Sequence, residues 1–188
     1  MKERNKFPYT ENYCEENIYL LAANLQFHGE RAYALFISNL EGRVAMVRQR
    51  ARPEGVVLWD YHVVLLSRDP DWNVWDFDTT GGFPLSANDY LQLSFPIDAP
   101  DAYRPLFRLV EVDTFLRDFS SDRSHMRDAS GRFLSPPPPW PPIHAELESN
   151  LTRFIDMKDP SVGRVMTRAE LGQLVGSQQA REENVVSP

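Results

Sequence analysis

At 188 residues and 21.7 kDa, the chain has the length of one globular domain, with little room for a second hydrophobic core. A formal net charge of −7 disfavours nucleic-acid binding, which usually needs a concentrated basic face. The opening MKERNKFPYT lacks the apolar run of a signal peptide, and no stretch approaches the roughly 18 apolar residues of a membrane span. We therefore expect a single domain over residues 1–176 with a flexible tail over 177–188, in an intracellular monomer that binds neither nucleic acid nor membrane.

The first predicted element is a helix over residues 12–25, where apolar residues recur at the spacing of one helical face. Asn12 is suited to cap it, and Glu15 three residues later completes a capping-box pattern. This places Cys14, the one cysteine of the chain, in the first turn. A single cysteine excludes an internal disulfide and a multi-cysteine metal site, so Cys14 is either a buried small side chain or a reactive thiol. The helix N-terminus favours the thiolate, whereas the charges of Glu15 and Glu16 oppose it.

Four predicted strands follow this helix. Apolar runs over residues 32–37 and 44–47 flank a polar loop, and we expect them to pair as an antiparallel hairpin. The strongest β signal covers residues 56–66, dense in Val, Leu, Trp and Tyr. Residues 72–78 form the next predicted strand, after a turn built on Asp69, Pro70 and Asp71.

The last two of these strands each carry a polar side chain of interest. His62 lies in a markedly apolar strand, where the alternative to a functional role is a core histidine with satisfied hydrogen bonds. If both strands form a hairpin, pairing His62 with Asp76 centres the turn on residue 69, where the turn signal is strongest. Directly opposed side chains have Cβ atoms about 4.5 to 5.5 Å apart, so Asp76 can accept a hydrogen bond from the imidazole. Asp78 shares this face and is the rival candidate, but in this register it opposes Asp60.

Further along the chain, residues 106–112 form a predicted strand and residues 113–119 a short helix or turn. The proline-rich run over 136–142 is incompatible with an α-helix or a central strand, and we expect a rigid polyproline II connection across the domain, with a partner motif as the alternative. Thr167 and Glu170 form a capping box at the start of a final short helix.

Cys14, His62 and Asp76 occur in the order used by some thiol acyl-transfer enzymes, with the nucleophile on an early helix and its partners on successive strands. This pattern predicts an α+β fold in which an antiparallel sheet packs against the early helix, as in papain-like and transglutaminase-like cores. Two alternatives stay open: a protease-like or transglutaminase-like acyl transferase with the same triad, and a non-catalytic adaptor that binds peptides.

Six sequence blocks resemble the signature blocks of protein N-terminal glutamine amidohydrolases. They occur in the order of that family, and the resemblance continues through the proline-rich segment to about Gly176. The blocks are YCEENI (13–18), ALFISN (34–39), QRARP (49–53), WDYHVVLL (59–66), WDFDT (75–79) and SDRSHM (121–126).

The resemblance implies that Cys14, His62 and Asp76 are the catalytic triad. The implied activity is hydrolysis of the side-chain amide of an N-terminal glutamine in proteins and peptides, giving glutamate and ammonia through a thioester, with no metal or organic cofactor. In eukaryotes such a glutamate can be arginylated and marks a protein for degradation. We accordingly expect a functional link to an arginyltransferase, and a location in the cytoplasm with the nucleus as an alternative.

Restriction to the chain terminus requires an acceptor for the free α-ammonium, and carboxylates are natural acceptors. Glu15, Glu16 and Asp60 are the candidates by proximity, although each can equally be a cap or a solvated charge. His125, in the last block but outside the triad, either lines the site or organises a loop.

Overall fold

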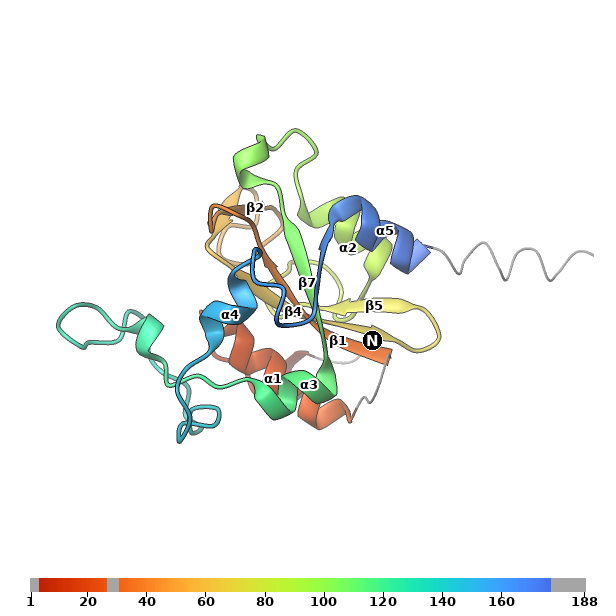
Figure 1. The fold of residues 1–188 in the computed structure, drawn as a ribbon. Helices are drawn as coiled ribbons and strands as arrows, with labels where there is room; N and C mark the ends of the chain where they lie inside the picture. Colours follow the sequence, from red (N-terminus) through yellow and green to blue (C-terminus); the bar gives the residue numbers. More distant parts are fainter. Residues whose placement is uncertain (1–3, 27–30, 177–188) are drawn as a thin grey trace, which may run out of the picture.

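The computed structural model describes residues 4–26 and 31–176, which form an antiparallel sheet flanked by helices (Figure 1). Six strands pair in the order β6-β5-β4-β1-β7-β8, and two further strands, β2 and β3, pair separately. The strands are β1 (Ala32–Ser38), β2 (Val44–Met46), β3 (Val57–Trp59), β4 (His62–Arg68), β5 (Trp72–Trp75), β6 (Leu85–Ser86), β7 (Leu106–Glu111) and β8 (Arg164–Thr167). The α-helices are α1 (Cys14–Leu25), α2 (Ala87–Ser94), α3 (Val112–Asp118), α4 (Leu151–Ile155) and α5 (Arg168–Gly176). The predicted α+β class with an antiparallel sheet is confirmed.

Alternation along the central strands gives the sheet two apolar faces, each covered by helices. In β1, Ala34 and Phe36 pack toward α1, α3 and α4, whereas Leu35 and Ile37 pack toward α2 and α5. Figure 1 shows these two groups of helices on opposite sides of the sheet. Burial on both faces explains why β1 and β4 are almost continuously apolar in the sequence.

Helix α1 forms as predicted, but its N-terminus differs from the predicted capping box. The helix begins at Cys14, and its N-cap, Tyr13, makes no side-chain capping bond. Asn12 has a positive φ of 67° and its amide donates to Ser135 Oγ, at 3.2 Å. Glu15 is fully buried and directs its carboxylate to Tyr61 at 3.0 Å. The side chains of Asn12 and Glu15 therefore form tertiary contacts instead of the predicted capping box.

Two strand predictions are wrong in their pairing. Strand β2 does not form a hairpin with β1, because β1 lies between β4 and β7 while β2 pairs with β3. The predicted strand over 56–66 is divided at Asp60 and Tyr61, so β3 and β4 belong to different sheets. Local apolar runs identified these strands but carry no information about which distant strand is the partner.

The later elements agree with the sequence patterns. Strand β7 and helix α3 occupy the predicted positions, and Thr167 and Glu170 form the predicted capping box of α5, with Thr167 N donating to Glu170 Oε2 at 2.7 Å and Glu170 N to Thr167 Oγ1 at 3.3 Å. The proline-rich segment contains no helix or strand, and Arg123 donates to its Pro138 and Trp140 carbonyls. The segment is thus a connection that contacts the domain, and its polyproline II conformation stays a prediction.

No helix within the described ranges is both long and apolar enough to cross a membrane. The predicted flexible tail over 177–188 lies outside the described residues.

Candidate active site

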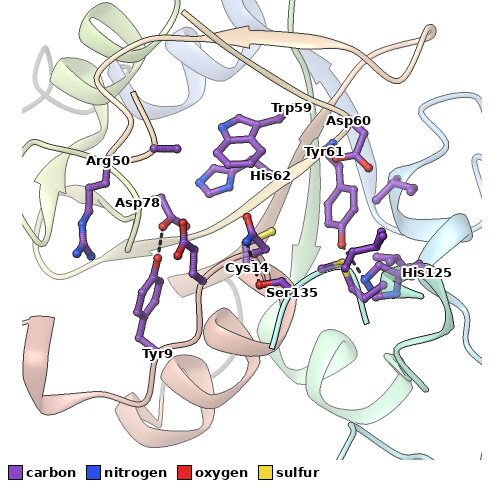
Figure 2. A pocket seen from close by; sticks show the side chains of 17 residues that line it. Tyr9, Cys14, Arg50, Trp59, Asp60, Tyr61, His62, Asp78, His125 and Ser135 are labelled. Atoms are coloured by element: carbon purple, nitrogen blue, oxygen red, sulfur yellow. Dashed lines mark hydrogen bonds between the residues drawn. The ribbon is translucent and has the colours of Figure 1, made fainter. Parts of the chain in front are cut away.

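Cys14 and His62 line the same cavity, of about 570 Å³, beside the N-terminus of α1 (Figure 2). Each is the first residue of its element, Cys14 of α1 and His62 of β4. Alternation places His62 on the face of Val64 and Leu66, opposite the face covered by α1. The thiol and the imidazole can therefore meet only at this end of β4. The cavity is lined by Tyr9, Glu11, Asn12, Cys14, Arg50, Ala51, Trp59, Asp60, Tyr61, His62, Asp78, His125, Met126, Leu134, Ser135, Leu151 and Ile155.

Asp76 lies behind His62 and is fully buried, with its Oδ1 2.9 Å from His62 Nε2. Because Nε2 bonds the carboxylate, Nδ1 is the ring nitrogen that remains for another partner. The predicted contact between His62 and Asp76 is confirmed, but the predicted register is wrong by two residues. In the observed register Leu65 faces Trp75, so β5 continued beyond its end would place Asp78 opposite His62 and Asp76 on the diagonal. Asp78 accordingly does not oppose Asp60 either.

The Asp76 carboxylate is held by further donors from three parts of the chain. The backbone N–H of Asp78 donates to Oδ1 at 2.8 Å. Tyr90, on α2, donates to Oδ2 at 3.0 Å, and the buried Gln49 amide lies 3.4 Å from the same oxygen. This set of donors satisfies a buried charge and fixes its orientation.

These surroundings shift the pKa values of the thiol and the imidazole. Burial raises the pKa of Cys14 well above its ordinary value, with further contributions from the Glu15 and Asp78 carboxylates, against an opposing hydrogen bond from Val63. Burial on its own lowers the pKa of His62, but Asp76, with smaller contributions from the Asp78 and Glu15 carboxylates, outweighs this effect and the net shift is upward. The helix N-terminus thus does not by itself favour the thiolate form of Cys14 in these surroundings.

His62, Asp76 and Asp78 also form a cluster whose potential ligand atoms lie within 4.8 Å of one another. Asp76 Oδ1 is already bonded to His62 Nε2, and Asp78 Oδ1 accepts from Tyr9 at 2.5 Å. Asp76 Oδ2 in turn accepts from Tyr90 and Gln49, so the ring nitrogen and both Asp76 oxygens are already engaged, and the cluster fits a hydrogen-bond network better than an ion site.

A second polar network lies on the other side of the cavity and includes His125. Tyr61 donates to Glu15 Oε2 at 3.0 Å, and His125 Nε2 lies 3.3 Å from both the Tyr61 hydroxyl and Glu15 Oε1. His125 lines the cavity and belongs to this network, so it fulfils the first of its two predicted roles. Glu15 does not line the cavity.

The three predicted acceptors of an α-ammonium have different positions. Glu16 is fully buried in an ion pair with Arg123, at 2.7 Å, and also accepts from Trp140 Nε1 at 2.7 Å. Glu16 does not line the cavity, and its charge is paired with Arg123 inside the fold. Asp60 is exposed and lines the cavity, where its Oδ1 accepts from the Tyr61 backbone N–H at 2.9 Å.

The sequence patterns did not single out several residues of this site. Trp59 lies nearly parallel to His62, with ring centroids 5.8 Å apart, and Tyr9 contacts Asp78. Tyr90 and Gln49 contact Asp76 from distant parts of the chain. The positions of Trp59 and Gln49 within the family-like blocks are a usable signal, whereas Tyr9 and Tyr90 fall outside those blocks.

A cysteine and a histidine on one cavity, with a buried carboxylate behind the imidazole, form the arrangement of a thiol-dependent acyl-transfer enzyme. The family model described as N-terminal glutamine amidase matches residues 9–175. The chain therefore belongs to the N-terminal glutamine amidase family, which comprises hydrolases acting on an amide.

Curated relatives support this membership. The chain is 40% identical to a protein N-terminal glutamine amidohydrolase of Homo sapiens, in an alignment that covers 93% of this chain and 90% of the relative. It is 41% identical to the protein of the same name from Bos taurus, with 85% and 82% covered. The relative of that name from Arabidopsis thaliana is 34% identical, with 96% and 92% covered.

Proposed function

We propose that this enzyme deamidates N-terminal glutamine in proteins and peptides to glutamate, releasing ammonia, with Cys14, His62 and Asp76 as its triad. The observation that carries the proposal is the meeting of Cys14 and His62 on one cavity, with Asp76 bonded to the imidazole, in a chain of this family. The arrangement of helix, sheet and triad also supports kinship with the papain-like and transglutaminase-like cores.

The proposed reaction begins with proton transfer from the Cys14 thiol to His62, whose pKa is raised by Asp76. The sulfur attacks the side-chain carbonyl carbon, and in this scheme backbone N–H groups at the start of α1 stabilise the oxyanion. His62 then gives its proton to the departing nitrogen, and ammonia leaves a thioester on Cys14. Water activated by His62 hydrolyses this thioester and regenerates the thiol.

Asp76 has an orienting and electrostatic role in this scheme. Its bond to Nε2 fixes the tautomer that presents Nδ1 to the thiol, and its charge stabilises the imidazolium formed during attack. The scheme uses protein groups and water alone. In eukaryotes the product, an N-terminal glutamate, can be arginylated. The proposal therefore includes a functional link to an arginyltransferase in the degradation of proteins by their N-terminal residue.

The first test is mass spectrometry of matched peptides after incubation with the purified protein. The set carries free N-terminal Gln, acetylated N-terminal Gln, N-terminal Asn and internal Gln. We expect the mass gain of an amide-to-acid conversion in the free N-terminal Gln peptide alone. Reaction at internal glutamines or cleavage of peptide bonds would favour the transferase or protease alternatives, and no reaction with reduced Cys14 would favour a peptide-binding adaptor.

The second test is Cys14→Ala, measured by ammonia release. We expect turnover of N-terminal Gln peptides to fall by at least about 10³-fold, since loss of a triad nucleophile removes the covalent route. The fold should persist, because a small, partly buried side chain at a helix terminus leaves little cavity. An unchanged thermal transition together with appreciable ammonia release would overturn the assignment of Cys14.

A further inference from the structure

The cavity of this enzyme is lined by three carboxylates, and they differ in their surroundings. Glu11, Asp60 and Asp78 line it, against the guanidinium of Arg50 and the imidazoles. Glu11 and Asp60 are exposed, whereas Asp78 is more deeply placed. Burial raises the pKa of Asp78, so its charge is less well solvated than a surface carboxylate. A cationic ligand group gains more from such a carboxylate than from one in water.

Asp78 also has the right position relative to the proposed chemistry. Its carboxylate lies within 4.8 Å of a His62 ring nitrogen. The α-nitrogen of glutamine lies four bonds from its side-chain carbonyl carbon, hence at most about 5 Å away. When the amide nitrogen lies against His62, the α-ammonium can reach a carboxylate at this distance.

The contacts of Asp78 hold its carboxylate in place without neutralising it. Tyr9 donates to Oδ1 at 2.5 Å, which leaves acceptor capacity on the carboxylate. Two cations, Arg4 and Arg50, attract the Asp78 charge electrostatically. Their hydrogen bonds go instead to backbone carbonyls, from Arg4 to Thr79 at 3.0 Å and from Arg50 to Phe77 at 3.4 Å. Arg50 also lies over the Tyr9 ring, 5.5 Å from its centroid. Figure 2 shows Asp78, Tyr9 and Arg50 on one side of His62, with Tyr61 and His125 on the other.

We propose that Asp78 binds the α-ammonium of the substrate and so restricts the enzyme to glutamine at a chain terminus. The inference rests on the proposed deamidation of N-terminal glutamine. A free N-terminus pairs its charge with Asp78. An acetylated or internal glutamine presents a neutral amide there and leaves a partly desolvated carboxylate without its cation, which disfavours binding.

The test compares two peptides on the Cys14→Ala background, where binding can be measured without turnover. One peptide begins with free Gln, and the other begins with a 4-carbamoylbutanoyl group, which keeps the side-chain amide and lacks only the α-amine. Titration calorimetry should give tighter binding of the free-amine peptide by at least about tenfold, the effect of a partly buried charge pair. Introducing Asp78→Asn should weaken the binding of the free-amine peptide alone and bring the ratio of the two affinities close to one.

Asp78→Asn is a conservative probe because its backbone N–H to Asp76 is retained and its amide oxygen can still accept from Tyr9. Asp60→Asn is the matched comparison, since it removes the competing cavity carboxylate. The inference would be overturned if Asp78→Asn kept the affinity ratio of the two peptides, or if it weakened the binding of both peptides equally. It would also be overturned if Asp60→Asn brought the affinity ratio close to one.

A kinetic readout separates this inference from the proposed function. In the enzyme with Cys14 intact, Asp78→Asn should raise KM for a free N-terminal Gln peptide by at least about tenfold, with a smaller effect on kcat. A loss in kcat alone would assign Asp78 to support of the triad and contradict the inference. If the unsubstituted enzyme releases no ammonia from such peptides, the proposed function fails as well; if it does while the variant keeps its discrimination, only the inference fails.

Discussion

Asp76 receives hydrogen bonds that differ in their consequences. The bond to His62 orients the imidazole, whereas the Tyr90 hydroxyl, at 3.0 Å, and the Gln49 amide fix the carboxylate from behind. Burial alone would raise the pKa of Asp76, but His62, the Asp78 backbone N–H and Tyr90 together lower it. The charge of Asp76 thus depends on residues that touch neither substrate nor thiol, and Tyr90 is a positioning residue in this sense.

Tyr90→Phe tests this dependence through stability. We expect the free energy of unfolding to fall by about 1.5–3 kcal/mol near neutral pH, the range for a hydrogen bond to a charged group. Because the folded-state pKa of Asp76 is lowered, its stabilising contribution is present above the unfolded-state pKa and is lost as pH falls through the folded-state value. Denaturant titrations at neutral and acidic pH should therefore show a smaller deficit in acid. An equal deficit at both pH values would contradict the coupling to Asp76.

The same variant has an expected kinetic signature. Weaker support of Asp76 lowers the stability of the His62 imidazolium, so the acid limb of the kcat/KM profile should move to lower pH. Tyr103→Phe, at an unrelated position that is neither buried nor in the cavity lining, is a control for loss of a tyrosine hydroxyl. An unchanged pH profile of kcat/KM in Tyr90→Phe would restrict the role of Tyr90 to packing.

At the scale of elements, the α1 helix is tied to the segment after α3 and to the proline-rich connection. Arg123 has a positive φ of 62° and forms a two-pronged ion pair with Glu16, at 2.7 and 2.8 Å. It also donates to the carbonyls of Pro138 and Trp140. One buried guanidinium therefore joins three segments that are distant in sequence and holds the helix that carries Cys14.

Breaking this ion pair should affect stability more than substrate discrimination. Glu16→Gln leaves the buried Arg123 without its counter-charge, a change that typically costs about 3–5 kcal/mol. Chemical denaturation should show this loss, while folded Glu16→Gln keeps the preference for a free α-amine. The double variant Glu16→Gln/Arg123→Met should recover part of the stability because it removes the unpaired cation. A lost amine preference in folded Glu16→Gln would return Glu16 to the substrate-binding residues.

At the scale of the whole molecule, the net charge of the chain has the same sign as the carboxylates that line the cavity. The chain carries a formal net charge of −7, and the carboxylates Glu11, Asp60 and Asp78 line the cavity. A negative field over a cleft raises the local concentration of cations and speeds their association. Substrates with a free α-ammonium, and above all those with a lysine next to it, should benefit from this field.

The role of this negative field can be tested by measuring turnover at different ionic strengths. Screening shortens the Debye length from about 10 Å at 0.1 M salt to about 3 Å at 1 M. We expect kcat/KM for a Gln-Lys peptide to fall across this range, and to fall more than for a matched Gln-Glu peptide. An equal salt response of the two peptides would show that the field has no role in substrate association.

The sequence by itself determined the local features of this protein. Apolar periodicity located α1, β4, β7 and α3, and turn chemistry located the connection between β4 and β5, because these signals arise from neighbouring residues. The proposed pairing of His62 with Asp76 also followed from local geometry, since the two-residue error in register preserves the face of the strand.

Only the tertiary structure decided which distant elements meet. It placed β1 between β4 and β7, divided the strand predicted over 56–66, and brought Tyr90 behind Asp76. It also paired Glu16 with Arg123 outside the cavity lining and placed Asp78 beside His62. The physical reason is that strand partners and buried carboxylates are selected by long-range packing and pairing, which no short window of sequence contains.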